Sequence, residues 1–355
     1  MKIDKNLLLS LLFIITAILK IKFEHNHSLT EVWYSNSVYV YISKVLRKLF
    51  GVFPFSVGDV LYTLLLVYFG YLVFLLFKGF KQNYSFVGGK LIQVGYCFFF
   101  LFHFLWGFNY NRERLEDKLS LEVDYNLEEL REFTLDLIEK ANKLHSQLIE
   151  DDKKLIGVPY EQEVLFKQAY EAYQELAKEN ELFRLQNHSV KNSLYSTLLS
   201  YMGYSGYFNP FTGEAQVNKL NRNYSLAFTI THEMAHQLGY AAEDEANFIG
   251  YLACLKGNTY FQYSGTLFAI NQCLRILKNV DNDAYQWIRA ELKQGILVDY
   301  ELSYSFWKQY SNPLEPLFKN IYDGFLKVNN QTNGINAYSY SIWLIMAYDR
   351  KNSNL

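Results

Sequence analysis

The chain has 355 residues, of which 50% are hydrophobic, and its formal net charge is −2 at pH 7. A charge so close to neutral excludes the strongly basic balance typical of nucleic-acid-binding proteins, and three cysteines are too few for a scaffold held by disulfides. The length is sufficient for one membrane region and one globular domain.

The first apolar run covers residues 7–19 and has a lysine on each side. It is shorter than the roughly 20 residues that cross the hydrocarbon core of a bilayer. The h-region of a signal peptide is therefore an alternative, but no small-residue cleavage site follows the run. Because lysine side chains reach to the membrane interface and so lengthen a span, we expect an uncleaved transmembrane helix at about 5–22.

Two further runs, at 58–78 and 91–110, are long enough to span a bilayer. Both are apolar around the whole helical circumference, which favours membrane spans over amphipathic helices of a soluble domain. The second run ends on Trp106 and Tyr110, a pattern typical of an aromatic anchor at the membrane interface. Residues 1–110 are therefore predicted to form a membrane region with three transmembrane helices.

The predicted orientation rests on the basic residues. Lys78, Lys81 and Lys90 lie between the second and third predicted spans without any acidic residue. The positive-inside rule places such a loop in the cytoplasm, although the loop at 20–59 is also basic. We therefore expect a multi-pass protein of the cell membrane whose domain at 111–355 lies outside the cytoplasm.

Beyond residue 110 the composition changes to that of amphipathic helices. Apolar residues recur at helical spacing between 127 and 144, and Asn126 before two glutamates is typical of a helix start. Another helix is expected at 160–180, and the chain from 227 onward is expected to be mostly helical.

A stretch rich in glycine, asparagine and aromatic residues occupies 201–223, where we expect a loop with one short extended segment at 214–218. The predicted fold class is therefore mainly α, with N-terminal transmembrane helices followed by a mostly helical domain that contains a small β element. Cys254 and Cys273 are expected to be buried thiols, with a disulfide between them as the alternative.

The segment 232–236 reads HEMAH and has a helical pattern. His232 and His236 are four residues apart, so both imidazoles project from one face of the helix and can chelate one Zn²⁺ ion. Glu233 lies one residue further round, beside the metal, where a general base for a zinc-bound water belongs. Gly239 is a natural terminator of this helix.

Zinc hydrolases use three protein ligands and leave one position for water. Glu243 and Asn247 are four residues apart on the next helical run and share a face, whereas Glu245 points about 200° away. This geometry favours Glu243 as the third ligand, with Asn247 as a hydrogen-bond partner of a ligand histidine. Glu245 remains the alternative ligand, because the turn after Gly239 can tilt either carboxylate inward.

Each feature also has an ordinary structural explanation. Acidic residues at a helix start commonly complement the helix dipole, and two histidines at this spacing are more often surface or packing residues than ligands. The joint arrangement of the two histidines, the glutamate between them, the helix end and the acidic helix that follows favours a metal site.

At these residues the sequence resembles the gluzincin-type zinc peptidases, which pair HExxH with a Glu-x-x-Ala-(Asp/Asn) helix, here 243–247. The resemblance implies a zincin-like domain, a Zn²⁺ cofactor and a peptide or protein substrate. One departure is that only seven residues separate His236 from Glu243, where typical gluzincins have a longer insert.

Nearly the whole chain also resembles a bacterial family of three-span membrane proteins of unknown function. The residues that carry this resemblance are 106–110, 210–215, 243–254, Gly334, Ala337 and Tyr338. This second resemblance implies no substrate.

The expected activity is therefore that of a membrane-anchored zinc peptidase in which Glu233 accepts a proton from the zinc-bound water and passes it to the leaving amine. An extended strand beside the active helix commonly pairs with substrate, and 213–218 is the candidate. Tyr263, Tyr338 and Tyr340 are candidate donors to the oxyanion, although tyrosine is so frequent here that packing roles are the usual alternative.

A non-catalytic membrane protein with a structural or sensory zinc site is the alternative function. A structural site needs no general base and normally fills its fourth position with protein, so Glu233 argues against it. A transporter is a third reading, but the spans carry no paired intramembrane charges to support it.

Overall fold

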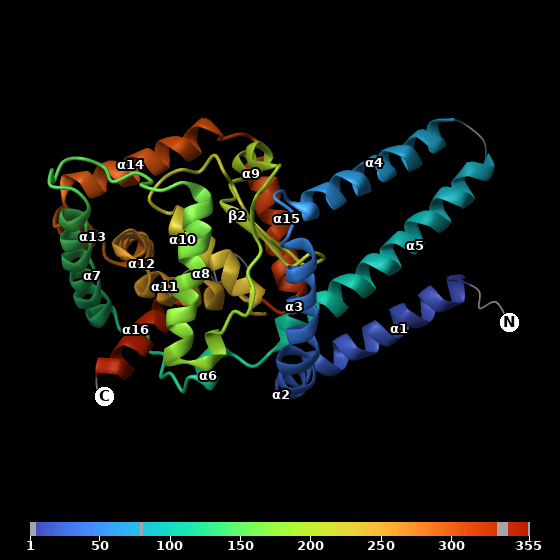
Figure 1. The fold of residues 1–355 in the computed structure, drawn as a ribbon, viewed down its shortest axis with the longest axis horizontal. Helices are drawn as coiled ribbons and strands as arrows, with labels where there is room; N and C mark the ends of the chain where they lie inside the picture. The colour runs from blue at the N-terminus through green and yellow to red at the C-terminus, as the bar shows by residue number, and fades with distance from the viewer. Residues whose placement is uncertain (1–4, 79–80, 332–339, 354–355) are drawn as a thin grey trace.

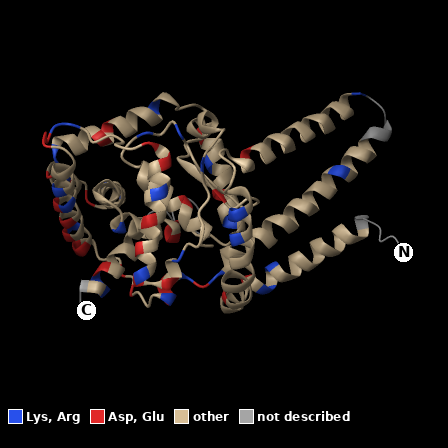
Figure 2. Ribbon diagram, in the orientation of Figure 1, with Lys and Arg blue, Asp and Glu red and all other residues tan. Residues whose placement is uncertain are grey.

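The computed structural model describes residues 5–78, 81–331 and 340–353; Gly334, Ala337 and Tyr338 lie outside these ranges. Three long helices extend from one side of a globular body, which contains the other helices and a small sheet (Figure 1). The projecting helices are α1 (Lys5–Glu24), α4 (Val57–Phe77) and α5 (Lys81–Leu105). Charged residues are sparse on these helices and concentrated on the body (Figure 2).

Helix α4 and the segment Tyr84–Leu105 of α5 are long and apolar enough to cross a membrane, by length and composition. In the most apolar 18-residue stretch of each, only 6% and 11% of the stretch, respectively, is buried. Core helices of a soluble domain would instead be mostly buried, because exposed apolar surface is unfavourable in water. Helix α1 is not among the helices that meet this criterion, so the three-span arrangement and its orientation stay predictions.

Helix α5 ends at Leu105, earlier than the predicted third span at 91–110. Trp106 follows directly and is only 4% exposed, with its ring centroid 4.4 Å from that of Phe208. The prediction that Trp106 is an anchor at the membrane interface is therefore wrong. The indole ring buries its apolar area against protein side chains of the body instead of lipid.

The body starts with the segments between α1 and α4 and continues after α5. The short segments are α2 (His27–Thr30), the π-helical η1 (Glu31–Val38), α3 (Tyr39–Phe50), η2 (Gly107–Asn111), α6 (Leu115–Lys118), η3 (Glu181–Phe183) and α9 (Ser196–Met202). The longer helices are α7 (Leu127–Leu148), α8 (Gln162–Glu179), α10 (Leu226–Gln237), α11 (Glu243–Lys256), α12 (Thr259–Val280), α13 (Asn282–Ala290), α14 (Gln294–Gln309), α15 (Glu315–Val328) and α16 (Ser341–Ser353). The fold is therefore mainly helical, as predicted.

The main apolar core surrounds α11 and α12, which pack against α7, α8 and α10. Helix α7 begins where the sequence predicts, because the Asn126 side chain accepts hydrogen bonds from the backbone N–H groups of the first turn. Cys254 on α11 and Cys273 on α12 are both buried, free thiols in this core, as expected.

The sheet has three short strands in the order β1-β3-β2. The strands are β1 (Val190–Asn192), β2 (Gly206–Asn209) and β3 (Glu214–Val217). β3 confirms the extended segment predicted at 214–218, and it is central: β1 pairs with it in parallel and β2 antiparallel, with Gly206 opposite Val217. β2 is therefore an edge strand, and β3 is not.

Helix α3, which lies between α1 and α4 in the chain, is bonded to the end of α10. The Ser43 hydroxyl and the Arg47 guanidinium both donate to the backbone carbonyl of Gln237, the last residue of α10. A cation at this point also complements the negative end of the helix dipole. The orientation of α10 is thus fixed by a helix that lies between the first two apolar runs of the chain.

The N-terminus of α4 is held by two buried carboxylates. Glu214 on β3 accepts hydrogen bonds from the backbone N–H groups of Val57 and Gly58, which would otherwise be unpaired at the helix start. Asp59 accepts from the backbone of Leu194 and from the Tyr207 hydroxyl on β2. The apolar helix and the edge strand are therefore bonded to each other.

Candidate metal centre

Helix α10 carries both histidines in a fully buried environment. It packs against α11 so closely that a Cβ atom on Gly250 would lie 3.0 Å from the His232 backbone nitrogen. Gly239, just beyond the end of α10, has φ +88°, a conformation that glycine adopts without strain. The predicted helix end is confirmed, and the turn that follows brings the start of α11 back toward the histidines.

Glu243, the first residue of α11, points at both imidazoles. Its Oε2 atom lies 3.3 Å from His232 Nε2 and 3.7 Å from His236 Nε2. Glu245 turns elsewhere: it accepts a hydrogen bond from the Leu115 backbone at 2.7 Å and pairs with Arg114. Of the two alternative ligands, the fold brings only Glu243 to the histidines.

Glu233 lies beside this group. Its carboxylate and the two imidazoles each offer a ligand atom, and these atoms lie within 4.8 Å of one another. A Cβ atom on Gly206 would come within 2.8 Å of Glu233 Oε1, so the edge strand β2 runs directly past this carboxylate. Burial raises the pKa of Glu233 to about 7, even though the two histidines act in the opposite direction.

The opposite charges of Glu243 and His236 stabilise each other. Burial alone would raise the pKa of Glu243, but the charge of His236 and the close approach of both imidazoles hold it well below its usual value. Burial alone would lower the pKa of His236, but the Glu243 charge raises it to about 9. A cation of any kind between these residues therefore meets a carboxylate that is already ionised.

The Nδ1 atoms of the two imidazoles, which point away from Glu243, differ in their hydrogen bonding. His236 Nδ1 lies 2.7 Å from the Tyr240 carbonyl oxygen, a contact that leaves Nε2 free to bind a metal. His232 Nδ1 is buried, and no hydrogen-bond partner for it occurs in the described part of the chain. Asn247, the predicted partner of a ligand histidine, is also buried, and its Nδ2 atom is likewise unpaired within those residues.

These residues fit a zinc ion by donor type and by spacing. Two imidazole nitrogens and a carboxylate oxygen form a donor set typical of catalytic zinc. Ligand atoms about 2.0–2.1 Å from a tetrahedral centre lie about 3.3 Å from each other, which the distances from Glu243 to the two histidines approach. Glu233 Oε2 and Glu243 Oε2 are buried and make no hydrogen bond within the described residues, as expected of atoms that bind a cation or water.

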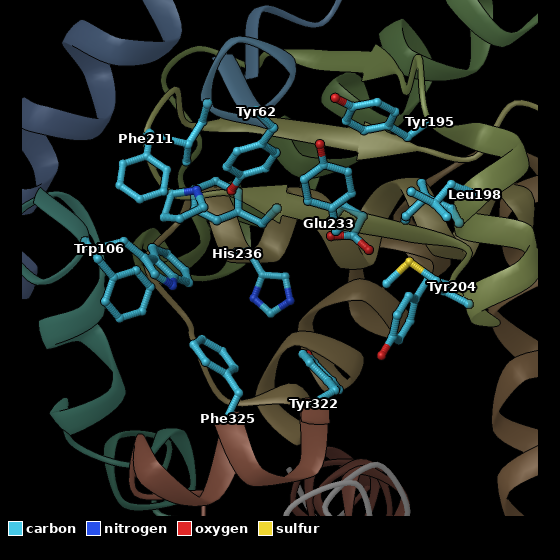
Figure 3. A pocket seen from close by; sticks show the side chains of 18 of the residues that line it. Tyr62, Trp106, Tyr195, Leu198, Tyr204, Phe211, Glu233, His236, Tyr322 and Phe325 are labelled. Carbon is cyan, nitrogen blue, oxygen red and sulfur yellow. The ribbon is translucent and has the colours of Figure 1, made fainter. Parts of the chain in front are cut away.

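A cavity of about 620 Å³ leads to this group. Figure 3 shows His236 and Glu233 facing the space, with Trp106 on one side, Tyr204 on the other, and Tyr322 and Phe325 from α15 across from them. The Tyr322 hydroxyl donates a hydrogen bond to Glu243 Oε1. The lining is otherwise dominated by aromatic and aliphatic side chains.

The sequence did not indicate several of the residues that line the cavity. Tyr204 and Tyr322 are separated from the HEMAH segment in the chain, and tyrosine is too common here for any one to stand out. The candidates Tyr263 and Tyr340 do not line the cavity; their hydroxyls donate to Asp299 and Glu116. The third candidate, Tyr338, lies outside the described residues. The strand expected to pair with substrate, 213–218, is the central β3, so the neighbour of Glu233 is β2 instead.

Comparison with known families gives a match over most of the chain. The model of a family described as "Protein of unknown function (DUF3810)" matches residues 34–346, which include α4, α5 and the whole His/Glu group. Comparisons with curated proteins and with solved structures gave no match.

Proposed function

This chain belongs to the DUF3810 family, and we propose that it is a membrane-anchored peptidase whose zinc ion is held by His232, His236 and Glu243. The observation that carries the proposal is the convergence of the two Nε2 atoms on Glu243 Oε2, with Glu233 beside them at the end of a cavity. A bound zinc ion would acidify a water molecule and polarise a scissile carbonyl.

Glu233 acts as the general base. Its pKa of about 7 suits a group that takes a proton from the attacking water and gives it to the leaving amine near neutral pH. Tyr322 holds the Glu243 carboxylate through its hydroxyl and so limits the orientation of that ligand. His236 is oriented in the same way by the Tyr240 carbonyl.

Peptide is the favoured substrate class because of β2. An edge strand offers unpaired backbone groups to an extended chain, and Gly206 to Phe208 of β2 line the cavity beside Glu233. A peptide that pairs with β2 would present its backbone carbonyls along the row of catalytic residues.

A structural or sensory zinc site is the second candidate function. Such a site is normally closed by a fourth protein ligand, whereas this group faces a cavity. A base that burial brings to a pKa of about 7 also has no purpose in a structural site.

The test is hydrolysis of an unstructured protein substrate by the purified full-length chain, together with its metal content. Glu233→Gln is expected to keep its zinc and to lose at least about 100-fold in kcat/KM, because general-base catalysis is removed and the ligands are not. The exposed Glu171→Gln on α8 serves as the matched control and is expected to behave as wild type. Full activity in Glu233→Gln would refute the assigned mechanism.

A further inference from the structure

The cavity changes character along its length. His232, Glu233 and His236 at one end are 5–8% exposed. Two lining residues on the long apolar helices are far more exposed: Leu66 on α4 is 65% exposed, and Phe98 on α5 is 47% exposed. The cavity is therefore open along the surfaces of α4 and α5, and also beside α9, where the lining residue Leu198 is 50% exposed.

These walls belong to the helices that meet the criterion for crossing a membrane. Leu65 and Phe69 of α4 and Phe102 of α5 all line the cavity. Phe102 also contacts Phe325 of α15, with ring centroids 5.9 Å apart, so α15 continues the wall that α5 begins. The space is thus shared between the spanning helices and the body, and charge is absent from the α4 and α5 part of its lining.

Helix α3 lies next to the cavity wall that α5 forms. It crosses the base of the α4–α5 pair (Figure 1) and contacts α5. Its polar face bonds to α10, whereas Tyr41, Val45 and Leu49, spaced one turn apart, are 73%, 61% and 56% exposed. An amphipathic helix with such a stripe is typical of the interface between lipid headgroups and acyl chains.

Helix α15 repeats this arrangement on the cavity itself. Tyr322 and Phe325 face the cavity, whereas Leu317, Ile321 and Val328 are 53%, 62% and 72% exposed. Apolar stripes on both α3 and α15 are the pattern expected where the open side of a cavity lies at the level of a bilayer surface.

We propose that the substrate is an extended apolar polypeptide segment supplied by the bilayer, which enters beside α4 and α5 and pairs with β2. This inference rests on the proposed peptidase function and adds the source and the polarity of the substrate. Apolar side chains of the segment fill the aromatic cavity, while β2 satisfies its backbone hydrogen bonds, which lipid does not satisfy.

The test uses the full-length protein in liposomes of phosphatidylethanolamine and phosphatidylglycerol. Two fluorogenic peptides share one extended, apolar reporter stretch, and only one of them continues into a transmembrane segment of about 20 leucine and alanine residues. The anchored peptide is expected to show a kcat/KM at least about tenfold higher, because entry from the bilayer raises its local concentration.

Neighbouring leucines on α4 provide matched variants. Leu65 lines the cavity, whereas Leu64 is 60% exposed and does not line it. Leu65→Trp fills the cavity and is expected to lower cleavage of the anchored peptide about tenfold, and Leu64→Trp is expected to leave it unchanged. Equal zinc content and Tm in the two variants show that both are folded.

The outcomes separate the two proposals. Equal cleavage of both peptides by the wild type, or equal effects of the two tryptophans, would overturn the proposed substrate class but not the peptidase function. The apolar cavity would then be assigned to a lipid acyl chain instead of a polypeptide. Failure of the zinc-loaded wild type to cleave either peptide would refute the peptidase function, and the substrate class with it.

Discussion

At the scale of single residues, the choice between Glu243 and Glu245 shows what helical spacing alone predicts. The period of the helix favours Glu243, but the sequence cannot show the turn that follows Gly239. In the structure Glu245 contributes to fold stability through Arg114 and the Leu115 backbone, and Glu243 faces the histidines. The two neighbouring carboxylates therefore have separate roles, as N-terminal residues on different faces of one helix.

Asn247 gives a prediction at this scale. It lies one turn after Glu243, and both its Nδ2 atom and His232 Nδ1 are buried without a partner among the residues that the structure describes. His232 lies against Gly250, three residues further along α11, so rotation of the Asn247 amide by 180° is expected to offer the oxygen acceptor that a metal-bound His232 needs at Nδ1. Asn247→Ala is expected to weaken zinc binding about 10- to 100-fold, whereas Asn247→Asp, which keeps an acceptor, is expected to retain it. Competition with a chelator measures both affinities, and equal affinity of the alanine variant would exclude this role.

At the scale of elements, α3 determines how α10 is held. Arg47 is 6% exposed and donates to the last carbonyl of α10, one residue after the proposed ligand His236. Arg47→Met is expected to lower the free energy of unfolding by about 2 kcal/mol, because the Gln237 carbonyl loses a charged hydrogen-bond donor. The exposed Lys48→Met on the same helix is the control and is expected to leave Tm in detergent unchanged. Equal Tm values for the two variants would contradict a supporting role for α3.

The helices could be predicted from the sequence better than the segments and side chains that pack against them. Strong periodicity and the Asn126 cap gave the start of α7, and charge-free runs gave α4 and most of α5. The position of β2 and the burial of Trp106 depend on contacts between segments far apart in the chain, such as Trp106 with Phe208, which no local pattern encodes. For the same reason the sequence indicated the HEMAH helix but not the tyrosines that face it.

At the scale of the whole molecule, buried charges join the segment before α4 to the segment after α5. Glu31, between α2 and α3, pairs with Arg112 and Lys118 beyond α5, and all three side chains are less than a tenth exposed. Removing one partner of such a group leaves buried charge uncompensated, which is strongly destabilising. Contacts between the first 110 residues and the rest of the chain therefore contribute to the stability of the folded protein.

This group predicts a dependence of stability on pH. Burial alone would raise the pKa of Glu31, but Arg112 and Lys118 lower it below its usual value. A carboxyl whose pKa is lower in the folded protein stabilises the fold above its unfolded pKa, about 4.3, and this stabilisation is lost as pH falls through the folded pKa. Glu31→Gln is expected to cost about 3 kcal/mol at pH 7 and progressively less below about pH 4.

The measurement is Tm from pH 7 to pH 3 for both proteins. Their difference isolates Glu31, because every other carboxylate, including those of the metal centre, is common to both. A difference in Tm that stays constant over this pH range would contradict the assignment.

The metal content of four matched proteins tests most directly whether His232, His236 and Glu243 form a metal centre. Wild type, Glu233→Gln, Glu243→Ala and Glu245→Gln are purified identically and their bound metals are determined by mass spectrometry. The wild type, Glu233→Gln and Glu245→Gln are expected to hold about one zinc ion per chain, and Glu243→Ala is expected to lose it. A wild type without zinc, or a Glu243→Ala variant that keeps it while Glu245→Gln loses it, would contradict the centre described.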